Sequence, residues 1–253
     1  MPIDTDGRKS MSKFDLIADR YADPAQYRPR KIYNDVVKRF VDLLLATVCL
    51  ILLTPVYGII AILVKLDTPG KVFYRGIRTG YHGRQFRVFK FRSMVDGAEK
   101  LGGGTTAYND KRITRVGRYL RKTKLDEIPQ LFNIILGHVS FVGPRPELPK
   151  YTDMYQNEQK IILDVRPGIT DISSIRYIYL EEIVGETNAD ERYERDILHK
   201  KNELRVQYIV RQSIFLDTWL LLETIRRVIK KTFYFMLGTG GTDHARTSYA
   251  EKV

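Results

Sequence analysis

Two adjacent carboxylates, Asp126 and Glu127, stand in the stretch TKLDEIPQLFNIILG, directly before a short apolar run. Proline is tolerated in the first turn of a helix but not deeper, so Pro129 predicts a helix that begins near residues 125–127. Free N–H groups and the helix dipole at such an N-terminus favour negative charge and also bind phosphate. The pair is therefore expected where carboxylates and phosphate groups can share one site.

Cationic residues precede this pair closely, at Arg118, Arg121, Lys122 and Lys124. Two carboxylates among cations fit Mg²⁺-dependent chemistry on a phosphate ester, in which carboxylates hold the metal. A carboxylate can also act as the nucleophile, as in enzymes that form an aspartyl phosphate. A capped helix start with salt bridges to neighbouring arginines would explain the same residues, so both interpretations stay open here. Glycosidases place two carboxylates across the sugar, which adjacent residues do not naturally do.

A second candidate is Arg145, which stands between Pro144 and Pro146 in VGPRPELP. The prolines fix the local backbone, and a planar guanidinium can bind a phosphate or a base edge through two N–H groups at once. A rigid turn with an exposed arginine would give the same pattern. Arg145 is therefore a candidate anion ligand whose role the pattern alone leaves open.

The positive charge of the chain is concentrated in one region. The 253 residues carry a net charge of +12, and residues 71–124 hold 15 Lys or Arg against 3 Asp or Glu. An anionic partner is expected there: nucleic acid, a phosphorylated ligand or a membrane surface. The single cysteine, Cys49, excludes an internal disulfide, and the histidines have no metal-ligand spacing. Neither a Walker phosphate loop nor a G-x-S-x-G motif occurs.

Residues 43–64 form an uncharged run of 22, which as a helix would be roughly 33 Å long, enough to cross a bilayer core. Thr54-Pro55 lies near its middle and predicts a sharp bend there. Both flanks are basic, and the positive-inside rule would hold both in the cytoplasm. A spanning helix stays open, but a re-entrant helix that breaks at Thr54-Pro55 and returns fits both observations better.

The motif KRFVD precedes this run. Lys38 and Arg39 suit the headgroup layer of a membrane, and Asp42 lies within about one helical turn of both, so it can pair with them as an anchor at the interface. Ordinary flanking charges would explain them equally well. Further along, residue patterns predict a β-hairpin over 72–91 and helices over 113–120, 128–136 and 189–231, the last with an apolar face that suits a core or a membrane interface.

Several stretches together closely resemble the bacterial sugar transferases, the monotopic polyprenyl-phosphate phosphoglycosyl transferases. They are KRFVD, the apolar run with Thr54-Pro55, FRVFKFRSM (86–94), the long block 112–147 and RPGIT (166–170). The similarity covers about residues 36–230 and is to the small, catalytic-domain-only form. One departure is Thr54-Pro55, where the family often has Ser-Pro; threonine keeps the hydroxyl.

The resemblance implies transfer of a phosphosugar from a UDP-sugar to polyprenyl (undecaprenyl) phosphate, with release of UMP. Asp126 matches the nucleophile that forms a phosphosugar-aspartyl intermediate, and Glu127 beside it matches the residue that binds Mg²⁺. The substrate site is expected to include Lys90, Arg118, Arg121, Gln130, Pro144, Arg145 and Pro146. The reaction would begin the assembly of a lipid-linked glycan on the cytoplasmic face of the bacterial inner membrane.

The expected fold is a mainly helical α+β domain of the monotopic, membrane-associated kind. It divides into a polar N-terminal arm (1–35), a re-entrant membrane helix (36–66), a catalytic domain with interfacial helices (67–236) and a C-terminal tail (237–253). Membrane lipids and downstream glycosyltransferases are the expected further partners, and nucleic acid is not, because no recognised binding motif occurs.

A different class of function is a non-catalytic membrane-anchored scaffold with a basic, anion-binding face. Such a scaffold would need the positive charge but has no use for an acidic pair beside it. No motif selects the sugar. Residues 179–194 could take part in that choice, although a solvated helix and loop explain them better.

Overall fold

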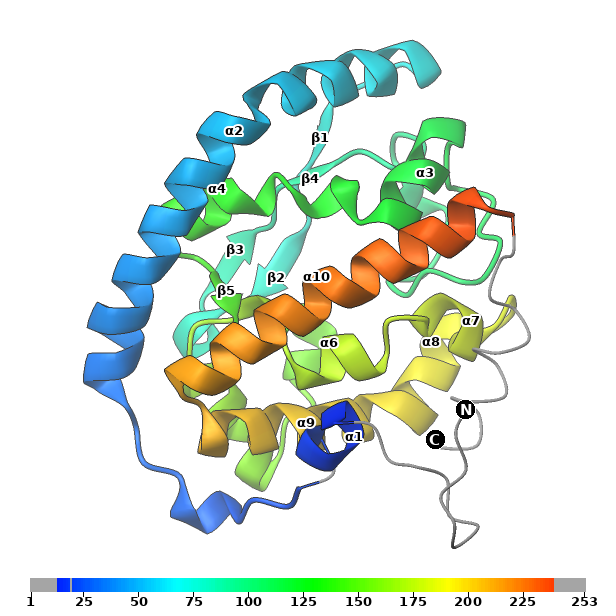
Figure 1. The fold of residues 1–253 in the computed structure, drawn as a ribbon. Helices are drawn as coiled ribbons and strands as arrows, with labels where there is room; N and C mark the ends of the chain where they lie inside the picture. The colour runs from blue at the N-terminus through cyan, green and yellow to red at the C-terminus, as the bar shows by residue number, and fades with distance from the viewer. Residues whose placement is uncertain (1–12, 19, 239–253) are drawn as a thin grey trace, which may run out of the picture.

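Helices dominate the computed structural model, which describes residues 13–18 and 20–238 (Figure 1). The α-helices are α1 (Lys13–Ala18), α2 (Lys38–Asp67), α3 (Arg115–Thr123), α4 (Gln130–Ile135), α5 (Pro149–Thr152), α6 (Ile172–Arg176), α7 (Leu180–Val184), α8 (Ala189–Arg192), α9 (Leu198–Arg211) and α10 (Ile214–Met236). The predicted mainly helical α+β class is confirmed. Most of the tail predicted for 237–253, and the start of the arm predicted for 1–35, lie outside the described residues.

The strands are short and pair in twos: β1 (Phe73–Tyr74) with β4 (Lys90–Phe91), β2 (Ile77–Thr79) with β3 (Gln85–Arg87), and β5 (Ser140–Val142) with β6 (Gly168–Thr170). The first two pairs are antiparallel and form the hairpin predicted over 72–91, which turns at residues 80–84. The parallel β5–β6 pair was not predicted, because each strand has three residues and its partner is remote in sequence.

The apolar segment forms one bent helix, α2. It is helical without interruption although Pro55 lies inside it, and Figure 1 shows it changing direction in its middle. The Thr54 hydroxyl donates to the Leu50 carbonyl at 2.8 Å, a kind of bond that bends helices. The carbonyl that the proline leaves without its usual donor is that of Ile51, so Thr54 does not replace the missing bond. Thr54-Pro55 thus bends the helix, where the sequence predicted a break.

Both halves of α2 pack against the same domain. Before the bend, Ala46 packs in a cluster with Ile134 of α4, and after it Ile60 and Val64 pack in a cluster with Phe91 of β4. The other side of the helix is strongly apolar and exposed, with Phe40, Leu44, Ile51, Leu52, Ile59, Ile62 and Leu66. By length and composition this helix could cross a membrane.

Three charged residues attach the first turns of α2 to the domain. Lys38 is buried and pairs with Asp217 of α10, and Arg39 donates to two carbonyls at the end of α4. Asp42 accepts a bond from the Phe141 N–H at 3.1 Å. The carboxylate that pairs with Lys38 is thus Asp217, where the sequence had offered Asp42. Lys38 and Asp42 face the protein interior rather than a headgroup layer, because α10 and β5 lie beside them.

The main core lies between α9, α10 and the β5–β6 pair, where Ile172, Ile209 and Leu220 are almost fully buried. Phe14 of α1 joins this core and stacks on Trp219, with ring centroids 6.1 Å apart. Part of the predicted polar arm is therefore packed into the domain. The helix predicted over 189–231 is interrupted at residues 212–213, where the Ser213 side chain accepts a bond from the backbone at the start of α10.

Candidate active site

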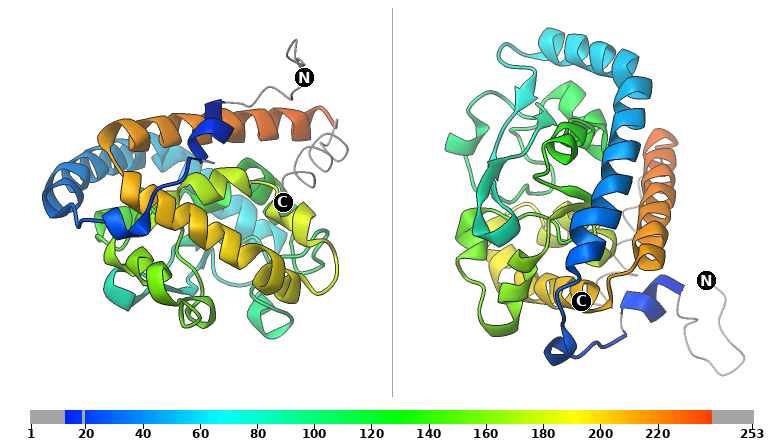
Figure 2. Two further views of the ribbon diagram at one scale, coloured as in Figure 1. Left: turned by 90° about the horizontal axis from the view of Figure 1, so that it is seen from below. Right: turned by 90° about the vertical axis from the view of Figure 1, so that its left-hand side faces the viewer.

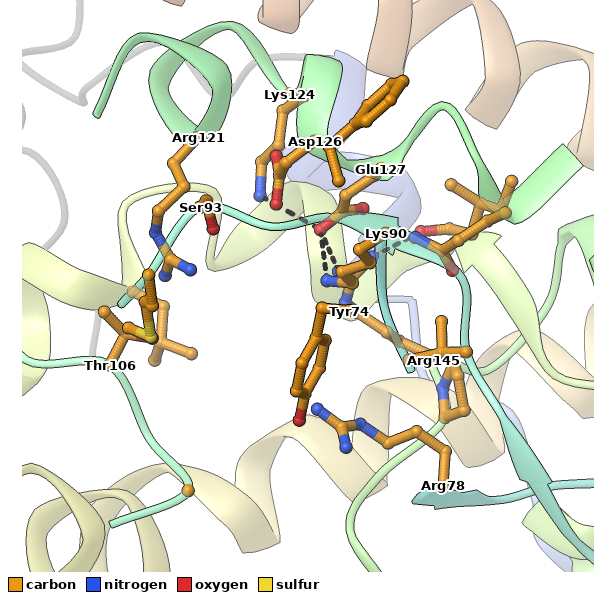
Figure 3. Close-up of a pocket in the computed structure, with 18 of the residues that line it drawn as sticks. Tyr74, Arg78, Lys90, Ser93, Thr106, Arg121, Lys124, Asp126, Glu127 and Arg145 are labelled. Carbon is orange, nitrogen blue, oxygen red and sulfur yellow. Dashed lines mark hydrogen bonds and ion pairs between the residues drawn. The ribbon is translucent and has the colours of Figure 1, made fainter. Parts of the chain in front are cut away.

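A cavity of about 1000 Å³ brings together most of the predicted site residues. Its walls come from the β1–β4 pair, the turn between α3 and α4, the loop around Arg145 and one side of α10. Figure 3 shows Asp126 and Glu127 on one side of the cavity and Tyr74 and Arg78 across from them. Cations from separate elements share the lining, among them Lys90, Arg121, Lys124 and Lys231. This concentration of positive charge suits an anionic ligand.

A left-handed residue sets the turn that carries the two carboxylates. Lys124, with φ 61°, ends α3, and the chain then forms the 3₁₀ turn Leu125–Glu127. Pro129 follows, and α4 begins at Gln130. The predicted helix start at 125–127 is therefore a separate turn, with α4 three residues later. Neither the turn nor α4 has a side-chain cap, so the carboxylates are not used as helix caps and point into the cavity (Figure 3).

Glu127 is held by three cations. Its Oε1 accepts from Lys90 Nζ at 3.0 Å and from the Arg145 guanidinium, and Lys124 Nζ lies 3.8 Å away. Burial raises the pKa of Glu127, but the charges of Arg145 and Lys90 outweigh it and hold the pKa well below its usual value. In turn, burial lowers the pKa of Lys90 to about 8, against the opposing effect of Glu127. Glu127 is thus a fixed, ionised carboxylate.

Asp126 has a different environment. It is only 4% exposed, and its Oδ1 has no hydrogen-bond partner among the described residues. Burial and the neighbouring charge of Glu127 raise its pKa, while Lys90, Arg121 and Lys124 oppose them. A buried carboxylate oxygen without a protein partner costs folding free energy, which marks it as a position for a ligand.

The carboxylate pair has the chemistry to hold a divalent cation. Asp126 and Glu127 offer the hard oxygen ligands that Mg²⁺ prefers, and Asp126 Oδ1 has no hydrogen-bond partner in the part of the chain that the structure describes. Within residues 13–18 and 20–238 no group of three or more His, Cys, Asp or Glu side chains could hold a metal. Mg²⁺ commonly takes one or two protein carboxylates and completes its shell with substrate phosphates and water, so two are sufficient.

Arg145 joins the GPRP loop to this pair. Its guanidinium donates to Glu127 and, at 2.8 Å, to a carbonyl of β6, and its backbone N–H donates to Asp171 at 3.3 Å. Arg145 is therefore not an exposed arginine on a rigid turn, which was the alternative interpretation of this motif. Of the flanking prolines, Pro146 lines the cavity, whereas Pro144 is buried and lies outside the lining.

A buried charged network holds the same loop and was not predicted. Glu147 accepts from Arg205 at 2.5 Å and from Lys201 at 3.2 Å, and the fully buried Arg205 lies 3.8 Å from Asp171. Burial raises the pKa of Glu147, but Lys201 and Arg205 outweigh it and hold the pKa far below its usual value. The only local signal was the position of Glu147 directly after GPRP, because Lys201 and Arg205 lie on the remote helix α9.

The remaining predicted residues differ in position. Arg121 lines the cavity, and its guanidinium pairs with Glu181 of α7 at 2.5 Å. Glu181 comes from the stretch 179–194, of which Leu180, Glu181 and Tyr193 line the cavity while residues 186–188 and 191–192 are exposed, so the predicted solvated helix and loop is only part of the picture. Gln130 is buried in the wall, and its Nε2 has no partner in the described part of the chain. Arg118 is exposed on α3 and is not among the lining residues.

Known proteins share most of this chain. It is 34% identical over 204 residues to the UDP-N-acetylgalactosamine-undecaprenyl-phosphate N-acetylgalactosaminephosphotransferase of Aeromonas hydrophila, over 79% of this chain and 45% of that protein. It is 37% identical over 207 residues to the UDP-glucose:undecaprenyl-phosphate glucose-1-phosphate transferase of Klebsiella pneumoniae, over 79% of this chain and 42% of that protein. Identity to the exopolysaccharide production protein ExoY of Rhizobium meliloti is 34%, over 76% of this chain and 85% of that protein.

The chain thus spans less than half the length of the first two of these relatives. The family described as bacterial sugar transferase matches residues 33–231, which include α2, the turn with the two carboxylates, the GPRP loop and most of α10. Because this match covers most of the sequence, the chain belongs to the bacterial sugar transferase family.

Proposed function

We propose that this protein transfers a phosphosugar from a UDP-sugar to polyprenyl (undecaprenyl) phosphate and releases UMP. The main support is the pair of buried carboxylates with opposite environments. Asp126 Oδ1 has no hydrogen-bond partner among residues 13–18 and 20–238, and Glu127 is held ionised by Arg145 and Lys90. The names of two relatives, which describe sugar-phosphate transfer with undecaprenyl phosphate, support the choice of acceptor.

Asp126 is the nucleophile in the proposed reaction. Its carboxylate oxygen forms a bond to the β-phosphorus of the donor, and the bond from that phosphorus to the bridging oxygen breaks, so UMP leaves with the bond electrons. A phosphate oxygen of the acceptor then attacks the same phosphorus. This second step releases the Asp126 carboxylate and gives a polyprenyl diphosphate sugar.

The neighbouring residues bind and orient the donor. Arg145 and Lys90 present positive charge toward the phosphates from one side of the cavity, and Arg121 does so from another. Glu127 and Asp126 would hold Mg²⁺, which when bound neutralises charge on the phosphate oxygens. The two bonds of the Arg145 side chain, to Glu127 and to β6, fix its guanidinium before substrate arrives.

A membrane-anchored scaffold fits these residues less well. A scaffold that binds anionic lipid needs only an exposed basic face. Asp126 and Glu127 are only 4% and 9% exposed. Burying two carboxylates costs folding free energy, and lipid binding would not require this burial. The buried acidic pair therefore favours an enzyme.

We also propose that α2 is re-entrant and keeps the site on the cytoplasmic face of the inner membrane. The two halves pack against one domain, and both ends bond to it: Lys38 to Asp217 at the start, and Asp67 to the Val116 N–H at 2.9 Å at the end. A spanning helix would put about 30 Å of hydrocarbon between its ends, which one domain cannot contact at both.

The topology is tested with single cysteines at residues 36 and 68 in a Cys49→Ser background. A membrane-impermeant thiol reagent applied from outside the cell is expected to label neither position, and both should react after lysis. Labelling of one position alone from outside would contradict the hairpin.

The reaction is tested by UMP release from a panel of UDP-sugars with purified protein, polyprenyl phosphate and Mg²⁺. Asp126→Asn is expected to abolish release because an amide is not a nucleophile, and Glu127→Gln to weaken both the rate and the Mg²⁺ dependence. Asp153→Asn, at an exposed position, is the matched control and should behave as wild type. A folded protein that releases no UMP from any donor would contradict the proposal.

A further inference from the structure

Lys231 of α10 lines the cavity but has no role in the proposed reaction. It lies on the side of the helix that also carries Thr224 and Val228, and all three line the cavity. Its ammonium donates to the Ile178 carbonyl at 2.8 Å and lies over the Tyr179 ring, 4.9 Å from the centroid. An ammonium has three N–H donors, and the carbonyl bond uses one of them.

A second lysine, Lys124, acts through its charge on both Lys231 and the carboxylate pair. Lys124 contributes to the electrostatic environment of Asp126, and its ammonium lies 3.8 Å from Glu127. Burial, followed by the positive charge of Lys124, lowers the pKa of Lys231 to about 7, against the opposing effect of Glu181. Both lysines line the same cavity, and an anion bound there would offset the repulsion between their charges.

The carboxylates nearest to Lys231 are already paired with other cations. Glu181 bonds to Arg121 at 2.5 Å, and Glu182 lies 3.6 Å from Lys122. Neither carboxylate is within ion-pair distance of Lys231 in the described part of the chain. The α10 side of the cavity therefore has positive charge that the protein does not neutralise by direct contact.

The outer side of α10 is apolar. The stripe of exposed residues beside the cavity-lining positions consists of Leu222, Ile225, Ile229, Phe233 and Met236. The end of the helix packs beside α3, where the Phe235 and Tyr119 rings lie 5.6 Å apart (Figure 1). Figure 2 shows α10 and α2 toward the same side of the molecule, away from the β2–β3 hairpin. A cationic corner of the active-site cavity thus borders an apolar surface.

We propose that Lys231, together with Lys124, binds the phosphate of the polyprenyl phosphate acceptor while the prenyl chain lies along the apolar stripe of α10. A single ligand that joins a phosphate to a long hydrocarbon matches both features at once. The acceptor then approaches Asp126 from the α10 side, and the donor occupies the Lys90 and Arg145 side. This inference rests on the proposed function and names the acceptor subsite of that same cavity.

Lys231→Met tests the proposal, because it removes the charge and keeps an apolar chain of similar length. Lys230→Met is the matched control: Lys230 is the preceding residue on the same helix, exposed and outside the cavity lining. In the absence of acceptor, one equivalent of UMP per enzyme reports the first half-reaction alone. Lys231→Met is expected to raise the KM for polyprenyl phosphate about tenfold or more, the loss that corresponds to about 1.4 kcal/mol, and to reduce that burst much less than turnover. Lys231→Arg should restore most of the affinity.

A measurement without turnover separates this proposal from the proposed reaction. Farnesyl phosphate is expected to raise the melting temperature of the wild type and of Lys230→Met, but not of Lys231→Met, and farnesol should raise none of them. A thermal shift with farnesol equal to that with farnesyl phosphate would overturn the phosphate site. An unchanged KM for acceptor in Lys231→Met, or a burst reduced as much as turnover, would overturn it as well. Absence of UMP from the wild type would refute the reaction but not the binding result.

Discussion

Replacing the buried Arg205 by methionine is expected to destabilise the protein and disturb the active site together. Arg205 is fully buried and bonds to Glu147 at 2.5 Å, with Asp171 3.8 Å away. Removing one member of a buried ion network usually costs about 3–5 kcal/mol, because the remaining charge is left uncompensated. Glu147 keeps Lys201 as a partner at 3.2 Å, so we expect the lower end, about 3 kcal/mol.

Thermal unfolding in detergent measures this cost. For a chain of this size 1 kcal/mol corresponds to about 2–4 °C, so Arg205→Met should lower the melting temperature by about 6–12 °C. Arg195→Met is the matched control: Arg195 pairs with Asp196 at 2.8 Å, but its side chain is 64% exposed. Solvent screens exposed pairs, so this variant should shift the melting temperature much less than Arg205→Met does.

The active-site effect follows from the same contacts. Asp171 accepts a bond from the Arg145 N–H at 3.3 Å, and Glu147 lies two residues further along the loop. A displacement of a positioning group by 1 Å can lower a rate by about 100-fold, so UMP release by folded Arg205→Met should fall toward that extent. Equal melting shifts for Arg205→Met and Arg195→Met, with normal UMP release, would refute the reasoning that this network is buried and holds the loop.

UMP release should fall on the acid side as Asp126, whose pKa is raised by burial and by Glu127, takes up a proton and stops being a nucleophile. It should also fall above about pH 8 as Lys90 loses its charge. The kcat/KM for the UDP-sugar, measured from about pH 4 to about pH 10, reports both limbs for the first half-reaction, and Lys90→Arg should remove the alkaline limb. Arg145→Lys should lower kcat/KM about 10- to 100-fold in steady-state kinetics, because an ammonium cannot make both guanidinium bonds, and unchanged kinetics would exclude this role. Pro55→Ala should straighten α2 and move residue 68 to the outer face of the membrane. A cysteine placed at residue 68 should then be labelled from outside the cell. If it stays protected, Pro55 does not set the bend.

Features that depend on neighbouring residues could be predicted from the sequence. The acidic pair, the basic region before it, the hairpin over 72–91 and the bend at Thr54-Pro55 each follow from local residue types. The partners of the charged side chains could not be predicted from the sequence. A charged residue that becomes buried has the same kinds of neighbours along the chain as a charged residue on the surface. Asp217 pairs with Lys38 from 179 residues away, and Glu181 reaches Arg121 across 60.

The bent helix and the active site are parts of one structure. Leu53, one residue before Thr54-Pro55, lines the cavity, and the Tyr57 hydroxyl donates at 2.8 Å to the carbonyl of Ile128, the residue after Glu127. The bend therefore lies against the turn that carries the two carboxylates. A straight α2 could not keep both Ala46 on α4 and Val64 on the β4 side, so the contact at Tyr57 depends on the bend. Helix α2 thus forms part of the wall of the cavity, so the proposed phosphate chemistry would take place beside the exposed apolar surface of this helix.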